Sequence, residues 1–125
     1  MVMRRILALA LVLAVVFATP AAAGGGSDRR GSCSGGPGHW RLRVQREDAD
    51  TLRVRFRIED VASGQSWQLF ISDNGTRIYS ATRTSTSQGE IRVDKNTRDR
   101  SGRDHIAANA VNSATGATCE GSVSI

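Results

Sequence analysis

Five arginines at alternate positions in two consecutive segments are the strongest chemical signal in this sequence. Arg41 and Arg43 lie in "WRLRVQ", and Arg53, Arg55 and Arg57 lie in "TLRVRFRIE". Alternate residues of an extended strand point to the same face. A hairpin of the two segments would therefore place all five guanidinium groups side by side, and such a face attracts phosphates and carboxylates.

The same arginines also have a compositional interpretation. Lys95 is the only lysine of the chain, so a G+C-rich genome accounts for part of the arginine excess. Glu47, Asp48 and Glu59 lie close enough in sequence to neutralise part of the face, and basic residues on exposed strands also oppose edge-to-edge aggregation. No aromatic residue alternates with the arginines, which argues against base stacking, and we expect no specific nucleic-acid recognition.

Catalysis requires a nucleophile, a base and a group that stabilises developing charge, all within hydrogen-bond reach. His39 and His105 are the only histidines. His105 directly follows Asp104, and adjacent strand residues point to opposite faces. No serine lies in a G-x-S-x-G turn, so we expect no enzymatic activity and no catalytic residue.

The metal-ligating residue types do not form a recognisable site either. Two histidines without neighbouring acids do not make a ligand set. The acidic segment 47–50 (Glu-Asp-Ala-Asp) lacks the alternating oxygen ligands and the glycine of a calcium loop. It is predicted to be a solvated turn, and the sequence predicts neither a metal nor a cofactor.

The first 23 residues have the features of a secretory signal peptide. Arg4 and Arg5 precede an apolar run over residues 6–17, and three alanines at 21–23 follow it. The run is shorter than the roughly 20 residues that a membrane-spanning helix needs. We expect no transmembrane segment after cleavage, and a secreted protein, extracellular or associated with the cell wall. The Arg-Arg pair leaves twin-arginine export open beside ordinary secretion.

Residues 24–32, "GGGSDRRGS", contain no apolar side chain to bury. They are predicted to be a flexible leader, and residues 33–125 to form one domain. Cys33 and Cys119 are the only cysteines, and an even number in an exported chain predicts that they form a disulfide. Because this bond closes most of the mature chain, the chain-entropy model gives it about 4–5 kcal/mol of stabilisation.

Between the two cysteines, apolar and polar side chains alternate with a period of two, and no segment has a helical period. These segments carry the arginines and histidines considered above. Asn74-Gly75 is a strong hairpin signal because these residues tolerate the positive φ of a type I′ turn. We expect an all-β, seven-stranded antiparallel sandwich of two sheets. Its strands are predicted at residues 40–45, 51–59, 65–72, 77–84, 90–94, 105–111 and 118–125.

The apolar phase of each strand predicts the core. Phe70 is out of phase, so it either covers an open edge or marks a bulge. The expected core residues are Trp40, Leu42, Val44, Leu52, Val54, Phe56, Ile58, Trp67, Leu69, Ile71, Ile78, Ile91, Val93, Ile106, Ala108, Ala110, Val123 and Ile125.

The segment "IAANAVNSATG" resembles the penultimate strand and following loop of fibronectin type III-like domains, with Asn112 and Gly116 in the turn. Asp104 occupies the position where that family usually has a corner tyrosine. Trp67 is similar to the core tryptophan of immunoglobulin domains, although the disulfide differs from theirs. Residues 33–125 as a whole resemble small exported actinobacterial proteins with two cysteines. These resemblances imply an immunoglobulin or fibronectin type III-like architecture and no particular activity.

Together these observations predict a secreted, non-catalytic module, expected to be a monomer. It would bind an anionic envelope polymer or surface through the arginine face. Candidate ligands are wall teichoic acid, extracellular DNA, anionic lipid and acidic polysaccharide. The alternative is a structural or protein-interaction domain of the cell envelope that is recognised through its loops. The predicted interaction loop of this alternative is the long connection "KNTRDRSGRD", which carries Arg98, Arg100 and Arg103.

Overall fold

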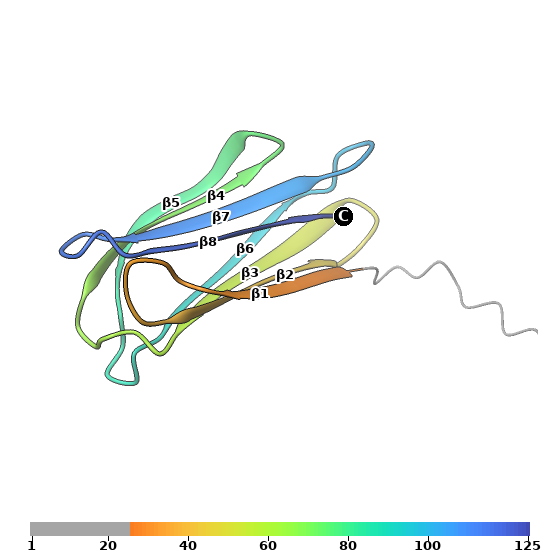
Figure 1. The fold of residues 1–125 in the computed structure, drawn as a ribbon. Coiled ribbons are helices and arrows are strands. Elements are labelled where there is room, and N and C mark those ends of the chain that lie inside the picture. The colour runs from red at the N-terminus through yellow and green to blue at the C-terminus, as the bar shows by residue number, and fades with distance from the viewer. Residues whose placement is uncertain (1–25) are drawn as a thin grey trace, which may run out of the picture.

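The computed structural model describes residues 26–125, which form two antiparallel four-stranded sheets and no helix (Figure 1). The expected signal peptide, residues 1–23, lies outside the described residues. The expected all-β, two-sheet architecture is confirmed, with eight strands in the described part of the chain rather than seven. They are β1 (Gly26–Ser32), β2 (His39–Arg46), β3 (Thr51–Glu59), β4 (Ser66–Asp73), β5 (Thr76–Thr84), β6 (Ile91–Arg98), β7 (His105–Asn112) and β8 (Thr118–Ser124).

The chain crosses between the sheets three times. The first sheet has the strand order β1-β2-β3-β6, and the second has the order β5-β4-β7-β8. The chain therefore changes sheet after β3, returns after β5 and changes again after β6, and Figure 1 shows the two layers that result. Among residues 26–125 there is no helix of the length and apolarity that crossing a membrane requires.

The core lies between the sheets, and the alternation within each strand produces it. In β3, every second residue from Leu52 to Ile58 is buried, and the residues between them are half-buried on the outer face. Of the expected core residues, Trp40, Ile78 and Ile125 are only partly buried at its margin, and the others are buried. The core also includes Val61, Ala117 and Cys119, which were not among the expected core residues. Val61 and Ala117 lie in connections, where the alternation of a strand predicts nothing.

The prediction that residues 24–32 form a flexible leader is wrong for residues 26–32, which form β1. This strand pairs with β2 along its whole length, from Gly26 opposite Gln45 to Ser32 opposite His39. It needs no apolar side chain, because its inward side faces the last strand at the open edge of the sandwich. There Ser27 Oγ donates to the carbonyl oxygen of Ser124 at 3.0 Å.

Trp40 closes the same edge between the two sheets. Its indole lies against Gly31 of β1 and Gly121 of β8, two positions where a Cβ atom would come within 2.6 Å and 2.3 Å of the ring. The two glycines thus make room for a side chain that is too large for the edge otherwise, and the indole remains partly exposed.

The disulfide between Cys33 and Cys119 is present, as predicted. It joins residues 86 positions apart in sequence, and it links the end of β1 in the first sheet to β8 in the second. Two backbone hydrogen bonds between Ser34 and Thr118 lie beside it. Such a bond indicates an oxidising compartment.

The β4–β5 hairpin has the predicted turn. Asn74 and Gly75 have φ values of 49° and 82°, both in the left-handed region that a type I′ turn requires. Phe70 lies half-buried on the outer face of the second sheet, where the guanidinium carbon of Arg77 is 4.2 Å from the ring centre. The irregularity in the β4–β5 pairing occurs one residue later, between Ile71 and Ser72.

Candidate anion-binding face

Four arginines form one straight row across the first sheet. Arg30 of β1 is paired with Arg41 of β2, Arg41 with Arg57 of β3, and Arg57 with Arg92 of β6. Residues paired in adjacent strands point to the same face, and this face is directed away from the core. We call these four residues the arginine row. Neighbouring strands lie about 4.8 Å apart, so three such spacings give the row a length of about 14 Å.

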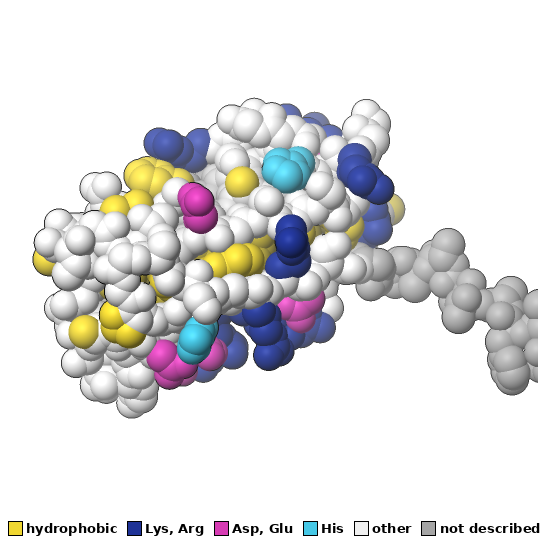
Figure 2. All heavy atoms as spheres, viewed as in Figure 1, with side chains coloured by type: hydrophobic (Ala, Val, Ile, Leu, Met, Phe, Trp, Pro, Cys, Tyr) yellow, Lys and Arg dark blue, Asp and Glu magenta, His cyan; other side chains and the backbone are white. Residues whose placement is uncertain are grey.

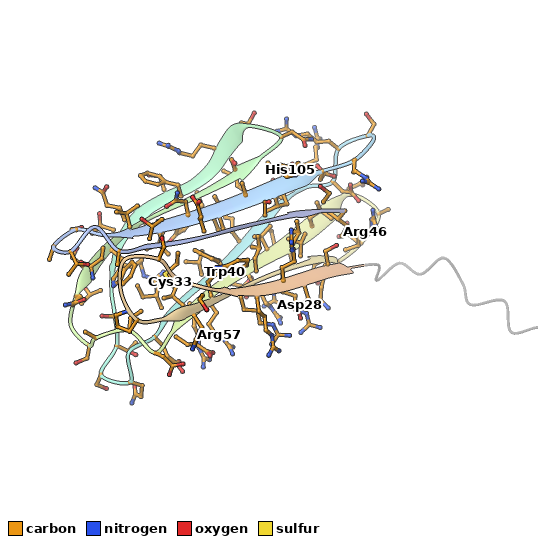
Figure 3. The ribbon with its side chains drawn as sticks, in the orientation of Figure 1. Asp28, Cys33, Trp40, Arg46, Arg57 and His105 are labelled. Carbon is orange, nitrogen blue, oxygen red and sulfur yellow. A yellow bond between two sulfur atoms is a disulfide. The ribbon has the colours of Figure 1, made fainter. Side chains whose placement is uncertain are left out.

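The adjacent row has basic residues in its middle and acidic residues at its ends. Its order across the sheet is Asp28, Arg43, Arg55 and Asp94. The hairpin of β2 and β3 therefore brings the predicted residues together as expected, with Arg53 opposite Gln45 in the next row. Figure 3 shows side chains of this sheet, including Arg57 and Asp28, on the side away from the second sheet.

Several of these arginines are paired with carboxylates. Arg41 Nε donates to Asp28 Oδ1 at 3.0 Å, and Arg53 Nε donates to Asp94 Oδ1 at 2.9 Å. Each hydrogen bond lowers the pKa of the accepting aspartate below its ordinary value. All four side chains are between about a third and a half exposed, so solvent screens both ion pairs and they contribute little to folding.

Other arginines of the face retain more of their binding capacity. Within residues 26–125, Arg30 and Arg43 make no ion pair with a carboxylate. Arg55 Nε is 3.8 Å from Asp94 Oδ2, and Arg92, whose side chain is 64% exposed, contacts Glu90 at 3.1 Å. Figure 2 shows Lys and Arg side chains gathered at the lower edge of the view, with acidic side chains among them.

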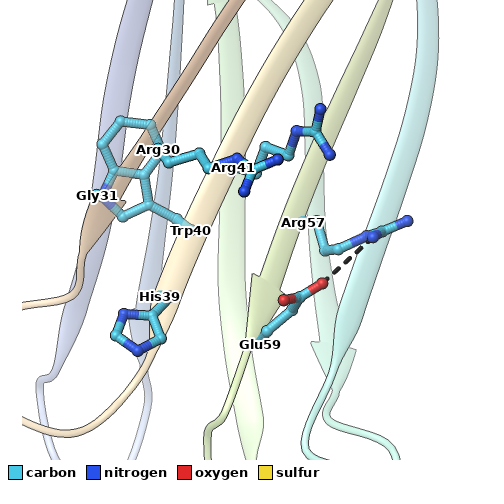
Figure 4. A pocket seen from close by; sticks show the side chains of 7 residues that line it. All are labelled: Arg30, Gly31, His39, Trp40, Arg41, Arg57 and Glu59. Atoms are coloured by element: carbon cyan, nitrogen blue, oxygen red, sulfur yellow. Dashed lines mark hydrogen bonds and ion pairs between the residues drawn. The ribbon is translucent and has the colours of Figure 1, made fainter.

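A pocket of about 520 Å³ lies beside the arginine row (Figure 4). At one side of the pocket, Arg57 Nη1 donates to Glu59 Oε1 at 3.3 Å. Three members of the row line it, so an anionic group placed there would meet several guanidinium groups and displace one carboxylate. The lining residues are Arg30, Gly31, His39, Trp40, Arg41, Arg57 and Glu59.

Two members of the row were not among the predicted binding residues. Arg30 falls in the segment that was expected to be a leader. Arg92 lies in a strand that is remote from the hairpin in sequence, and the pairing of β3 with β6 places it beside Arg57. The alternation of "IRVDK" in β6 carries the signal for an outward arginine, whereas "DRRGS" in β1 carries none. Only the strand order places both arginines on this face.

The predicted loop arginines lie elsewhere. Arg98 is the last residue of β6, opposite Thr51 and far along the strand from Arg92. Arg100 and Arg103 lie in the connection to β7, and all three residues are exposed. The structure thus separates these arginines from the arginine row.

The two histidines do not come together. His39 begins β2 in the first sheet, 3.9 Å from Asp60. His105 begins β7 in the second sheet, and its Nδ1 lies 3.0 Å from Ser124 Oγ. Asp104 is buried whereas His105 is exposed, as opposite strand faces require. Across residues 26–125, no group of three or more His, Cys, Asp or Glu side chains is placed to hold a metal ion.

Sequence reasoning missed the complete burial of Asp73 and Asp104. Asp73 was left between two predicted strands, and Asp104 was noted only as the neighbour of His105 and as the residue at the corner-tyrosine position. The signal was present in the strand phases, because Asp73 continues the inward series of Leu69 and Ile71, and Asp104 precedes Ile106 by two residues.

Comparison of the chain with protein-family models, with curated proteins and with solved structures finds no match. The function is therefore argued from the geometry of the face and from the chemistry of its side chains.

Proposed function

We propose that this chain is a secreted, non-catalytic β-sandwich module that binds a phosphate-bearing anionic polymer of the cell envelope. The arginine row is the single observation that carries the proposal. Four guanidinium groups in register across four strands form a linear array of donors, and guanidinium groups match phosphate oxygens in charge and geometry.

The length of the row favours a polymer over a small anion. A single phosphate in the pocket contacts only neighbouring guanidinium groups, whereas the row extends for about 14 Å. A chain of repeating anionic groups that crosses the strands engages all four arginines. The acidic residues at both ends of the next row, Asp28 and Asp94, favour binding along the arginine row rather than along the strands.

The immunoglobulin or fibronectin type III-like identity belongs to the same proposal. Without β1, the sandwich has three strands, β2-β3-β6, against four, β5-β4-β7-β8, a count and crossing pattern that fit a seven-stranded domain of this type. Trp67 is 1% exposed in the core. Asn112 Oδ1 accepts hydrogen bonds from the amides of Ala114 and Thr115 in the turn that the resemblance implied.

Secretion is supported by two independent features. One is the signal-peptide pattern of residues 1–23. The other is the disulfide, which persists in oxidising compartments. We place the module outside the cell or on its wall, where wall teichoic acid offers phosphates along a flexible chain.

The test is binding to purified wall teichoic acid over a series of salt concentrations. The variant Arg30→Gln/Arg41→Gln/Arg57→Gln removes the three arginines of the row that line the pocket. Each lost phosphate contact lowers the slope of log affinity against log salt by about 0.7–0.9, so the variant should lose roughly 2–3 of that slope and most of its affinity. The domain should stay folded because these side chains face outward.

The matched control is Arg98→Gln/Arg100→Gln/Arg103→Gln, which removes the same charge from the end of β6 and from the β6–β7 connection. It should bind like the unaltered protein. If the control loses binding while the pocket variant keeps it, the arginine-row proposal is wrong. The loop-based function then gains support, because Arg98 ends β6, Arg100 and Arg103 lie in the connection that follows, and all three are exposed.

A further inference from the structure

Two aspartates are completely buried at the end of the sandwich opposite the disulfide. Asp73 is the last residue of β4, and Asp104 directly precedes β7; both are 0% exposed. Within the described part of the chain, no donor reaches any of their four carboxylate oxygens. An ionised carboxylate buried without a partner is so unfavourable that the group takes up a proton instead.

The charged groups around this pair are mostly acidic. The carboxyl of Asp104 lies against those of Asp73 and Asp99, and burial together with these neighbours raises the pKa of Asp104 to about 6. Arg46 of the first sheet donates from Nε to Asp99 Oδ2 at 3.3 Å. The guanidinium group near the pair is therefore bound to Asp99 and not to Asp73 or Asp104.

The remaining charges nearby come from the chain around Asp104. Arg103 and His105 flank it in sequence, and both are exposed while Asp104 is buried. Asp104 exchanges two backbone hydrogen bonds with Ile125, which fix its position beside the end of β8. If Asp73 and Asp104 were both ionised, no cation would compensate the second negative charge.

We propose that in mildly acidic solution Asp104 is protonated in the folded domain and donates this hydrogen to Asp73, and that losing the proton to solvent as the pH rises loosens this end of the sandwich. The proton satisfies both residues at once, because the hydroxyl of Asp104 donates and one oxygen of Asp73 accepts. Asp73 is taken as the acceptor because both of its buried oxygens are otherwise without a donor, whereas Asp99 also accepts from Arg46. This inference does not depend on the proposed function.

The backbone contacts around the pair show what would loosen. The amide of His105 donates to Asn74 Oδ1 at 2.8 Å, which ties β7 to the β4–β5 turn. The amide of Asp99 donates to the carbonyl oxygen of Asp50 at 2.8 Å, which ties the β6–β7 connection to the β2–β3 turn. Repulsion between two buried charges acts on these contacts, whereas the opposite end remains held by the disulfide.

The test measures the thermal midpoint and amide hydrogen exchange of the full domain from pH 4.5 to 8. Because the raised pKa means that the folded state holds the proton more tightly than the unfolded state, stability should fall as pH rises from about 4 to about 6. We expect the midpoint to drop by on the order of 10 °C. Exchange should increase at residues 99–106 and not around Cys33.

Asp104→Asn should abolish this pH dependence, because the amide donates to Asp73 at every pH. Asp94→Asn, which removes an exposed carboxylate, is the matched control and should keep it. A flat profile for the unaltered protein would overturn the proposal. So would a rise in the midpoint on adding calcium chloride at pH 8 that Asp104→Asn abolishes, because a cation would then neutralise the pair.

If Asp104→Asn does not fold, carboxyl ¹³C chemical shifts of the unaltered protein decide the question. A titration of the Asp104 carboxyl near pH 6 supports the shared proton. Ordinary aspartate titration of Asp104 near pH 4 refutes it.

Discussion

Reduction of the Cys33–Cys119 bond should destabilise the domain more than any single surface change. The bond joins residues 86 positions apart in sequence. In the unfolded state it therefore closes nearly the whole domain, from Cys33 to Cys119, into one loop. Dithiothreitol breaks it without altering a side chain elsewhere, and the comparison of oxidised with reduced protein isolates the covalent constraint.

The expected magnitude follows from the length of the closed loop. The loop-entropy relation gives about 4–5 kcal/mol for a separation of this size. Domains of this length have a total free energy of unfolding of roughly 5–15 kcal/mol, so reduction should remove a third or more of it. The midpoint of thermal unfolding should fall by on the order of 20 °C.

Urea unfolding followed by tryptophan fluorescence measures this free energy in both states. The Cys33→Ala/Cys119→Ala variant serves as the control: it should match the reduced protein and should not respond to dithiothreitol. A loss below about 1 kcal/mol on reduction would refute the reasoning. It would mean that the pairing of β1 with β2 and the Ser34–Thr118 contacts already hold this edge without the bond.

Two further predictions concern the open edge and acid stability. Gly121→Val should destabilise the domain by about 1–3 kcal/mol in urea unfolding, because a Cβ there would lie 2.3 Å from the Trp40 indole. Ser122→Val, on the same strand, should cost less. Equal losses of stability for the two variants would contradict this account of the edge. Because the pKa values of Asp28 and Asp94 are lowered, their ion pairs stabilise the fold above the ordinary aspartate pKa and are lost in stronger acid. The double variant Asp28→Asn/Asp94→Asn should therefore lose less stability than the unaltered protein when the pH is lowered below about 4, as measured by urea midpoints. Identical losses would argue against these pairs.

The sequence by itself determined the features that depend on local pattern and composition. Strict alternation in segments such as residues 51–59 decides which side chains enter the core, because a strand exposes alternate residues to opposite faces. Asn74-Gly75 determined a turn because few residues accept positive φ twice in succession. Two cysteines in a chain with a predicted export signal left one intramolecular pairing.

The sequence did not reveal β1, because its stability comes from backbone hydrogen bonds to β2 and not from burial of its own side chains. A run such as "GSDRRGS" has no apolar phase from which a strand could be inferred. The tertiary structure shows that β1 pairs with β2 and contacts β8 at the edge of the sandwich.

Only the tertiary structure decided the composition of the candidate site. Arg41 and Arg57 meet across a hairpin that the sequence predicts, but Arg30 and Arg92 join them through the strand order β1-β2-β3-β6. The buried pair of Asp73 and Asp104 likewise arises where β4 and β7 run side by side. Strand order and register are set by how two sheets share one core, so residues distant in sequence become neighbours only when that core closes.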